Sequence, residues 1–175
     1  MSLQPTTYHL KPIQGTTLVE VILYVGLTAT ILLGISALIA TTLESRVKSQ
    51  TISEVDSQGL AVMQIIAQSI RNAQAINSPG LGAVSSTLSI SMSLPSVNPT
   101  IFNLAANTIQ ITEATGQPIP LTNLRVIASG LNFYNLSRAG TLGTIQIQFN
   151  LTYLNPQNRN EYDYSKTFIS SASLR

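Results

Sequence analysis

The chain has 175 residues and carries nine Lys/Arg and seven Asp/Glu, a formal net charge of +2. Charged residues are 9% of the total, far below the roughly 25% of soluble domains. No basic cluster or basic–aromatic stripe suggests a nucleic-acid groove. The absence of cysteine excludes disulfides, thiolate catalysis and thiolate metal sites. The length suits one ordinary domain with an additional N-terminal element.

The N-terminal part combines a polar lead with a long apolar run. Residues 1–15 form the lead and end in Gly15, and the only ionisable side chains in residues 17–43 are Glu20 and Tyr24. This run is long enough for a membrane helix, which needs about 20 residues. A charge inside such a helix costs roughly 2.5–3.5 kcal/mol on insertion scales, so we expect a partner for Glu20.

The helical pattern continues beyond the apolar run. Residues 44–75 contain no proline, and apolar side chains recur there at intervals of mostly three and four residues: Ile52, Val55, Val62, Ile66, Ile70 and Ala73. We predict one helix from about residue 17 to residue 76, apolar all round in its first half and amphipathic in its second. The sequence at 77–80, Asn-Ser-Pro-Gly, is expected to end it.

The remaining chain has the pattern of short strands. Alternating or β-prone segments occur at 87–94, 108–112, 124–127, 130–135, 144–151 and 166–174, and residues 155–160 are expected to form a loop. Neighbouring strands joined by turns favour an antiparallel sheet, one face of which packs on residues 52–73 of the helix. The sequence therefore predicts an α+β fold.

Gly15, followed by Thr16-Thr17-Leu18-Val19-Glu20 and a long apolar helix, resembles the processing site of type IV pilin and type II secretion pseudopilin precursors. The resemblance implies that a prepilin peptidase cuts after Gly15 and that the new amine of Thr16 is N-methylated. It also implies that Glu20, fifth in the mature chain, pairs with the terminal amine of an adjacent subunit. Two positions differ from the usual pattern: Gln14 replaces a basic residue, and Thr16 replaces phenylalanine.

Residues 64–73 and 164–175 are similar to the helix end and the final strand of J-type minor pseudopilins and W-type minor pilins. The implied fold is pilin-like. The implied division is a cleaved leader (1–15), a transmembrane and filament-core helix (16–43), an amphipathic helix (44–76) and a β-rich extracytoplasmic domain (77–175). The implied partners are prepilin peptidase, other major and minor pilins or pseudopilins, and the inner membrane, before assembly into a pilus or pseudopilus.

Catalysis has little support in the residue types present. The single histidine, His9, lies in the lead, so the mature chain would lack a Ser–His pair. We expect no enzyme, cofactor or metal site. Glu161 and Asp163 are two carboxylates without a recognised calcium-loop spacing, and a polar loop is the preferred interpretation.

Two other functions remain open. The chain could be an uncleaved single-pass envelope protein with a ligand-binding β domain. It could also be a secreted module, although the apolar run exceeds the roughly 7–15 residues of a signal h-region.

Overall fold

The computed structural model describes Gly15 and residues 17–175. The chain divides into two compact units, Met1–Leu43 and Glu44–Arg175. Helix α1 runs Leu18–Asn72. The strands of the described residues are β1 (Ala75–Ser78), β2 (Val84–Ser85), β3 (Leu88–Ser91), β4 (Thr100–Ala105), β5 (Thr108–Glu113), β6 (Ile119–Pro120), β7 (Val126–Asn135), β8 (Thr144–Tyr153) and β9 (Ser165–Ser173), with short 3-10 helices at Pro95–Val97 and Asn160–Tyr162.

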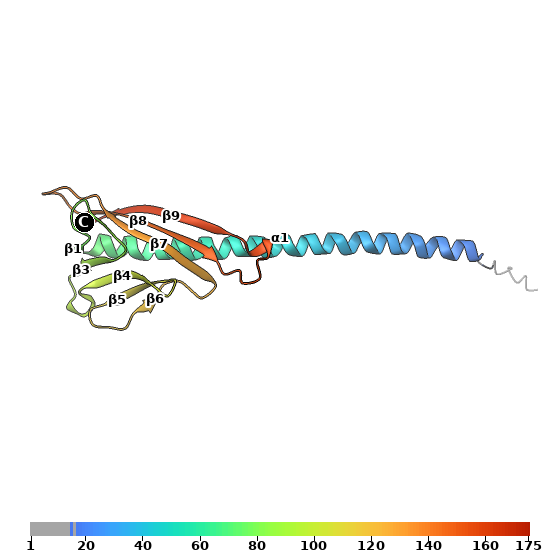
Figure 1. Ribbon diagram of the computed structural model, residues 1–175, viewed down its shortest axis with the longest axis horizontal. Coiled ribbons are helices and arrows are strands. Elements are labelled where there is room, and N and C mark those ends of the chain that lie inside the picture. The colour runs from blue at the N-terminus through green and yellow to red at the C-terminus, as the bar shows by residue number, and fades with distance from the viewer. Residues whose placement is uncertain (1–14, 16) are drawn as a thin grey trace, which may run out of the picture. The chain divides into compact units, whose positions relative to one another are not determined.

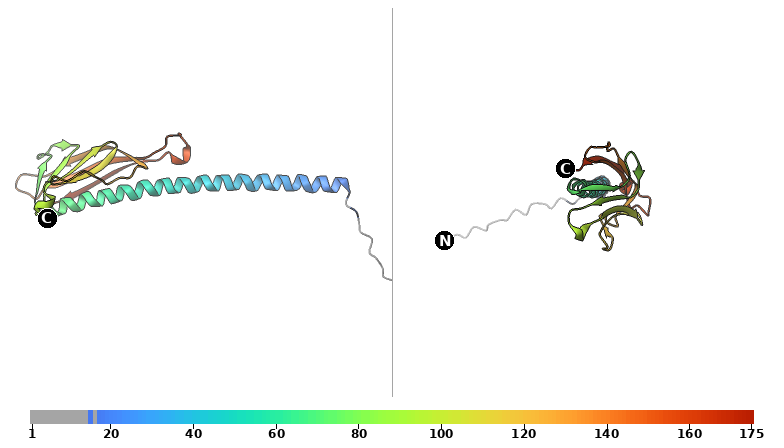
Figure 2. Two further views of the ribbon diagram at one scale, coloured as in Figure 1. Left: turned by 90° about the horizontal axis from the view of Figure 1, so that it is seen from below. Right: turned by 90° about the vertical axis from the view of Figure 1, so that its left-hand side faces the viewer.

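The second unit contains two antiparallel sheets, so the predicted α+β fold is confirmed (Figure 1). One sheet has the order β1-β3-β4-β5-β6 and the other the order β2-β7-β8-β9. The sheets meet where β4 and β5 lie next to β7. The Ala128 amide of β7 donates to the Asn107 carbonyl at 2.8 Å, which joins the sheets through the backbone. Figure 2 shows both sheets curving around one side of the helix segment Glu44–Asn72.

The helix, together with Ala73 just after it, contributes one continuous buried stripe to the core of this unit. Its members follow one another at intervals of three or four residues: Thr51, Val55, Gly59, Val62, Ile66, Ile70 and Ala73. The predicted stripe is therefore confirmed, except that Ile52 is only half-buried. Gly59 lies midway in the seven-residue step between Val55 and Val62, and it completes the periodicity that the apolar residues alone left broken.

Gly59 is buried because an aromatic ring takes the place of its side chain. A Cβ atom at this position would lie 2.1 Å from Cζ of Phe168, a residue of β9. The Phe168 ring also stacks on Phe149 of β8, with centroids 5.4 Å apart. The missing side chain therefore lets β9 pack directly against the helix.

The helix ends earlier than the predicted residue 76. It stops at Asn72, and the Gln74 amide then donates to the Ser91 carbonyl at 2.8 Å. Residues Ala75–Ser78 pair with β3 as an antiparallel strand. Sheet hydrogen bonds replace the last predicted helical turn, because they satisfy the same backbone groups while extending the sheet.

Residues of both strand candidates, 124–127 and 130–135, belong to one strand in the structure. β7 begins at Val126, because residues 124–125 form a turn, and its register to β8 shifts between Ser129 and Asn132. Gly130 lies in this bulge with φ of +61°. Glycine adopts this left-handed conformation without steric cost, so the strand continues where the sequence suggested a break.

The four-stranded sheet has one buried face and one outward face. β8 alternates almost strictly between buried and half-buried residues. The outward positions of the four strands carry no charged residue: Val84, Ile127, Ser129, Asn132, Tyr134, Thr144, Gln146, Gln148, Asn150, Thr152, Ser165, Thr167, Ile169, Ser171 and Ser173. Pairs of hydroxyls bridge neighbouring strands here, as in Thr144–Ser173 and Thr152–Ser165, both at 2.9 Å.

The hydrophobic core of the described residues lies wholly inside Glu44–Arg175. Its apolar members begin at Val55 and end at Leu174. The described part of the first unit contributes no buried residue. The second unit therefore has the core that an independently folding domain requires.

Candidate assembly and processing site

The first described turn of α1 is capped by its own sequence. Thr17 lies immediately before the helix, and its Oγ1 accepts a hydrogen bond from the Glu20 amide at 3.3 Å. A threonine followed three residues later by glutamate is the spacing of a capping box. The spacing was present in the sequence and would have predicted both the helix start and the role of Thr17 as the cap.

The Glu20 carboxylate has one protein partner in the described residues. The Tyr24 hydroxyl, one turn further along, donates to Glu20 Oε1 at 2.9 Å. Glu20 is half-exposed, and it lies at the helix end where the macrodipole favours negative charge. A carboxylate accepts about four hydrogen bonds, so Glu20 retains capacity for a further, cationic donor.

Of the two predicted processing residues, the structure places one. Gly15 is exposed, and no described atom lies within 4 Å of where its Cβ would be. Thr16, like the leader residues 1–14 with His9, lies outside the described residues. The glycine side of the junction is therefore open in the described structure.

The apolar part of α1 is long and apolar enough to cross a membrane, and its most apolar window is entirely unburied. Its leucines and isoleucines, such as Leu33 and Leu38, are exposed. An exposed apolar surface of this length indicates a lipid or protein environment around it. By length and composition the helix is thus compatible with a membrane anchor.

Four threonine hydroxyls of this helix segment are hydrogen-bonded within the helix. Thr28, Thr30 and Thr42 each donate a side-chain hydrogen bond to the carbonyl four residues before, at 2.7–2.9 Å. Thr41 donates to the carbonyl three residues before at 3.0 Å. Transferring an unpaired hydroxyl to an apolar medium costs several kcal/mol, and these hydrogen bonds reduce that cost.

Of the two residues considered for a cation site, Glu161 uses its carboxylate and Asp163 its backbone carbonyl in other contacts. Glu161 forms an ion pair with Arg159. The carbonyl oxygens of Asn160 and Asp163 accept hydrogen bonds from the Lys48 ammonium, at 3.1 and 2.5 Å. No group of three or more metal-ligating side chains occurs within the described residues. The Lys48 ammonium therefore already binds the carbonyl oxygens that this turn would offer to a cation.

Comparisons with known proteins give no relative for this chain. A scan against models of protein families, a search of curated proteins and a search of solved structures each found no match.

Proposed function

We propose that the chain is a minor pilin or pseudopilin, a structural subunit that a prepilin peptidase processes after Gly15. Its apolar helix would be held first in the inner membrane, with the second unit extracytoplasmic, and then in the core of a type IV pilus or type II secretion-like filament. The observation that carries the proposal is Glu20, the one charged residue in an apolar helix of membrane length, located directly after the glycine junction.

The exposed apolar helix supports the filament part of the proposal. Burying apolar surface contributes roughly 25 cal/mol per Å², and both lipid and neighbouring helices provide that burial. The helix can therefore leave the bilayer only if like helices replace the lipid around it. The internally bonded threonine hydroxyls suit either environment, since they require no outside partner.

Glu20 supports the assembly part. Cleavage after Gly15 would create a positively charged amine at Thr16, four residues before Glu20 in sequence. In a helix bundle of low dielectric, an unpaired charge is costly and a carboxylate–ammonium pair removes that cost. The free hydrogen-bonding capacity of Glu20 would take the amine of a neighbouring subunit, and the pair would set the axial register of the two helices.

The mature N-terminus tests this proposal. Mass spectrometry of the protein from the cell envelope should identify a chain beginning with N-methylated Thr16. A Gly15→Val variant should retain the full-length start, because the peptidase requires the small residue at its cleavage site in the family that the junction resembles.

The two alternative functions predict a different N-terminus for the mature protein. An intact Met1 in the wild type would favour the uncleaved envelope protein, and a start beyond residue 40 would favour secretion by signal cleavage. Either result would overturn the proposal.

A further inference from the structure

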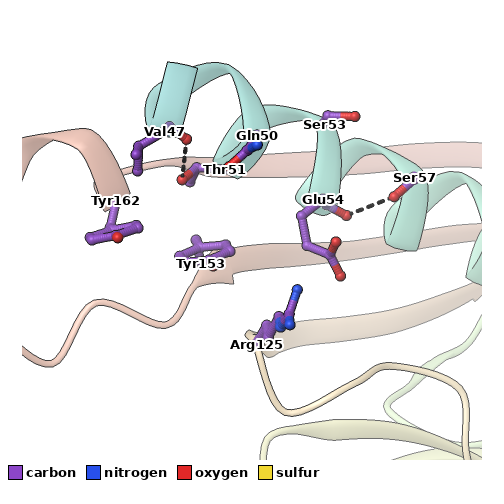
Figure 3. Close-up of a pocket in the computed structure, with 9 residues that line it drawn as sticks. All are labelled: Val47, Gln50, Thr51, Ser53, Glu54, Ser57, Arg125, Tyr153 and Tyr162. Atoms are coloured by element: carbon purple, nitrogen blue, oxygen red, sulfur yellow. Dashed lines mark hydrogen bonds between the residues drawn. The ribbon is translucent and has the colours of Figure 1, made fainter. Parts of the chain in front are cut away.

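A cleft in the second unit has the size and lining of a ligand site, and the proposed function assigns it no role. The cleft encloses about 660 Å³, within the 300–1,000 Å³ range of small-molecule pockets. Its helix side includes Gln50, Ser53 and Glu54, and its opposite side includes Arg125, Tyr153 and Tyr162. Figure 3 shows the Arg125 side chain pointing toward Glu54, with the two tyrosine rings across from the helix.

The two tyrosines form one aromatic wall. Their rings are nearly parallel, with 9° between the planes and 5.7 Å between centroids. Smaller hollows of about 330 and 460 Å³ adjoin the same two residues. Neither ring is fully buried. The wall therefore offers apolar ring faces to a ligand. These faces provide the apolar contact that the polar groups of the cleft cannot supply.

The polar groups of the cleft have unused hydrogen-bonding capacity. Asn123 donates to Glu54 Oε1 at 2.6 Å and so orients the carboxylate. Within the described residues, Glu54 Oε2 and the Arg125 guanidinium make no hydrogen bond or ion pair with protein groups. The carboxylate only accepts, the guanidinium only donates, and the Gln50 amide does both.

The charge balance of the cleft selects the class of ligand. One acid and one base leave no net charge, so neither an anion nor a cation is favoured as a whole. A hydroxyl both donates and accepts, and it therefore matches Glu54 and Arg125 at once. A ring with hydroxyls at its rim and C–H bonds on its faces also matches the tyrosine wall. A neutral saccharide has both properties.

The wall is held in place before any ligand arrives. Tyr162 belongs to the turn whose carbonyls, of Asn160 and Asp163, are bonded by the Lys48 ammonium. Arg159 lies over the Tyr162 ring at 5.6 Å and forms the ion pair with Glu161. A pre-formed wall lowers the entropy lost on binding. We propose that this cleft binds a neutral saccharide, with a pyranose ring on Tyr153 and Tyr162 and its hydroxyls on Glu54 and Arg125.

Saturation-transfer difference NMR tests the inference with the full chain in zwitterionic micelles whose headgroup contains no sugar. The probes are lactose and N,N′-diacetylchitobiose, each at about 10 mM, a concentration suited to weak complexes. Protons of one pyranose ring should receive saturation. Arg125→Gln should weaken binding about tenfold, the usual loss when a charge-assisted hydrogen bond is removed. Tyr162→Ala should abolish the transfer.

Matched variants outside the cleft are the controls. Tyr134→Ala, on the outward face of the four-stranded sheet, and Arg138→Gln, in the β7–β8 loop, should bind as the wild type does. Gln50→Ala is a second cleft variant that keeps a good helix former, in case Tyr162→Ala alters the fold.

Two results would overturn the inference: no saturation of either disaccharide, or an equal loss of signal in the cleft variants and in the control variants. The test is made on the unassembled protein, so it does not depend on whether the chain is processed or enters a filament.

Discussion

At the scale of single residues, Glu20 has a local role in the structure and an intermolecular one in the proposed function. Its amide is capped by Thr17 and its carboxylate accepts from Tyr24, contacts that stabilise the helix start in any environment. The sequence predicted the importance of Glu20 because a charge in an apolar run is conspicuous. The spacings Thr17-x-x-Glu20 and Glu20-x-x-x-Tyr24 were equally visible, and they identify the local contacts through helix geometry alone.

Substitutions at Glu20 separate the two roles. Glu20→Gln keeps an acceptor for Tyr24 and removes the charge, and Glu20→Ala removes both. Both variants should insert into the membrane normally. Each should reduce incorporation into filaments more than about tenfold, because an unpaired buried charge costs about 3–5 kcal/mol. Immunoblots of membranes and of sheared filaments provide the two measurements.

Tyr24→Phe is the matched control, since it loses the local hydrogen bond and keeps the carboxylate. It should assemble as the wild type does. Normal assembly of Glu20→Gln together with failure of Tyr24→Phe would show that the local contact, rather than the charge, matters for assembly.

Lys166 provides a prediction about pH. Its ammonium donates to Asp56 Oδ1 at 3.0 Å, and this hydrogen bond is the main cause that raises the pKa of Lys166 above its ordinary 10.5. A raised pKa in the folded state means that the pair stabilises the fold fully below pH 10.5. The contribution is then lost as the pH rises through the higher, folded-state pKa.

Urea unfolding of the wild type and of Lys166→Met between pH 8 and pH 12 measures this contribution. The difference in the free energy of unfolding should be constant at the lower end and shrink at the upper end. Asp56→Asn removes the partner of Lys166. In that background, Lys166→Met should change the free energy of unfolding by less between pH 8 and pH 12. A difference that grows with pH would contradict the predicted loss of the Lys166–Asp56 contribution at high pH.

At the scale of elements, the strand predicted from the clearest alternation agrees well with the structure. Residues 144–151 alternate strictly, and they form the core of β8 because one face is buried and the other is not. Strand β4 went unpredicted, since Ile101 and Asn103, on the face opposite Thr100 and Phe102, are also half-buried. A strand covered on both faces loses its alternation.

The pattern also could not assign strands to sheets. Alternation reports which face of a strand is buried and not which neighbour it pairs with. The division into two sheets depends instead on long-range contacts such as Ala128 to Asn107. The same reason explains the early helix end, since the pairing of β1 with β3 outweighs local helix propensity.

Gly59 shows how the packing of a strand on a helix can depend on a missing side chain. Gly59→Ala should destabilise the second unit by about 1–3 kcal/mol through overpacking against Phe168, partly offset by the better helix propensity of alanine, about 1 kcal/mol. Chemical unfolding of the full chain measures the net loss.

A double variant checks the cause. Phe168→Leu shortens the ring that the new methyl group meets, so Gly59→Ala should cost less in that background than alone. Equal costs in both backgrounds would remove Phe168 from the explanation. Ala61→Gly, at an exposed position of the same helix, calibrates the propensity term.

At the scale of the whole molecule, the hydrophobic core of the described residues belongs to one of the two units. Every apolar residue of the core cluster belongs to Glu44–Arg175. A fragment with these residues should fold cooperatively in aqueous buffer without detergent, and its circular dichroism should indicate both helix and strand.

Amide exchange gives the sharper measurement for the fragment. Amides in β7 and β8 should be the slowest, and those of residues 44–50 should exchange fast, because the helix start is newly exposed there. A fragment that aggregates or lacks slow amides would show that the first unit is needed for folding.

The outward face of the four-stranded sheet has a consequence for behaviour in solution. Salt weakens contacts between charges through Debye screening, over about 8 Å at physiological ionic strength. Strands β2, β7, β8 and β9 present only hydroxyl, amide, phenol and aliphatic groups outward. A contact made through this face is therefore expected to keep its strength from fresh water to brine, whereas a contact between exposed charged groups weakens as the salt concentration rises.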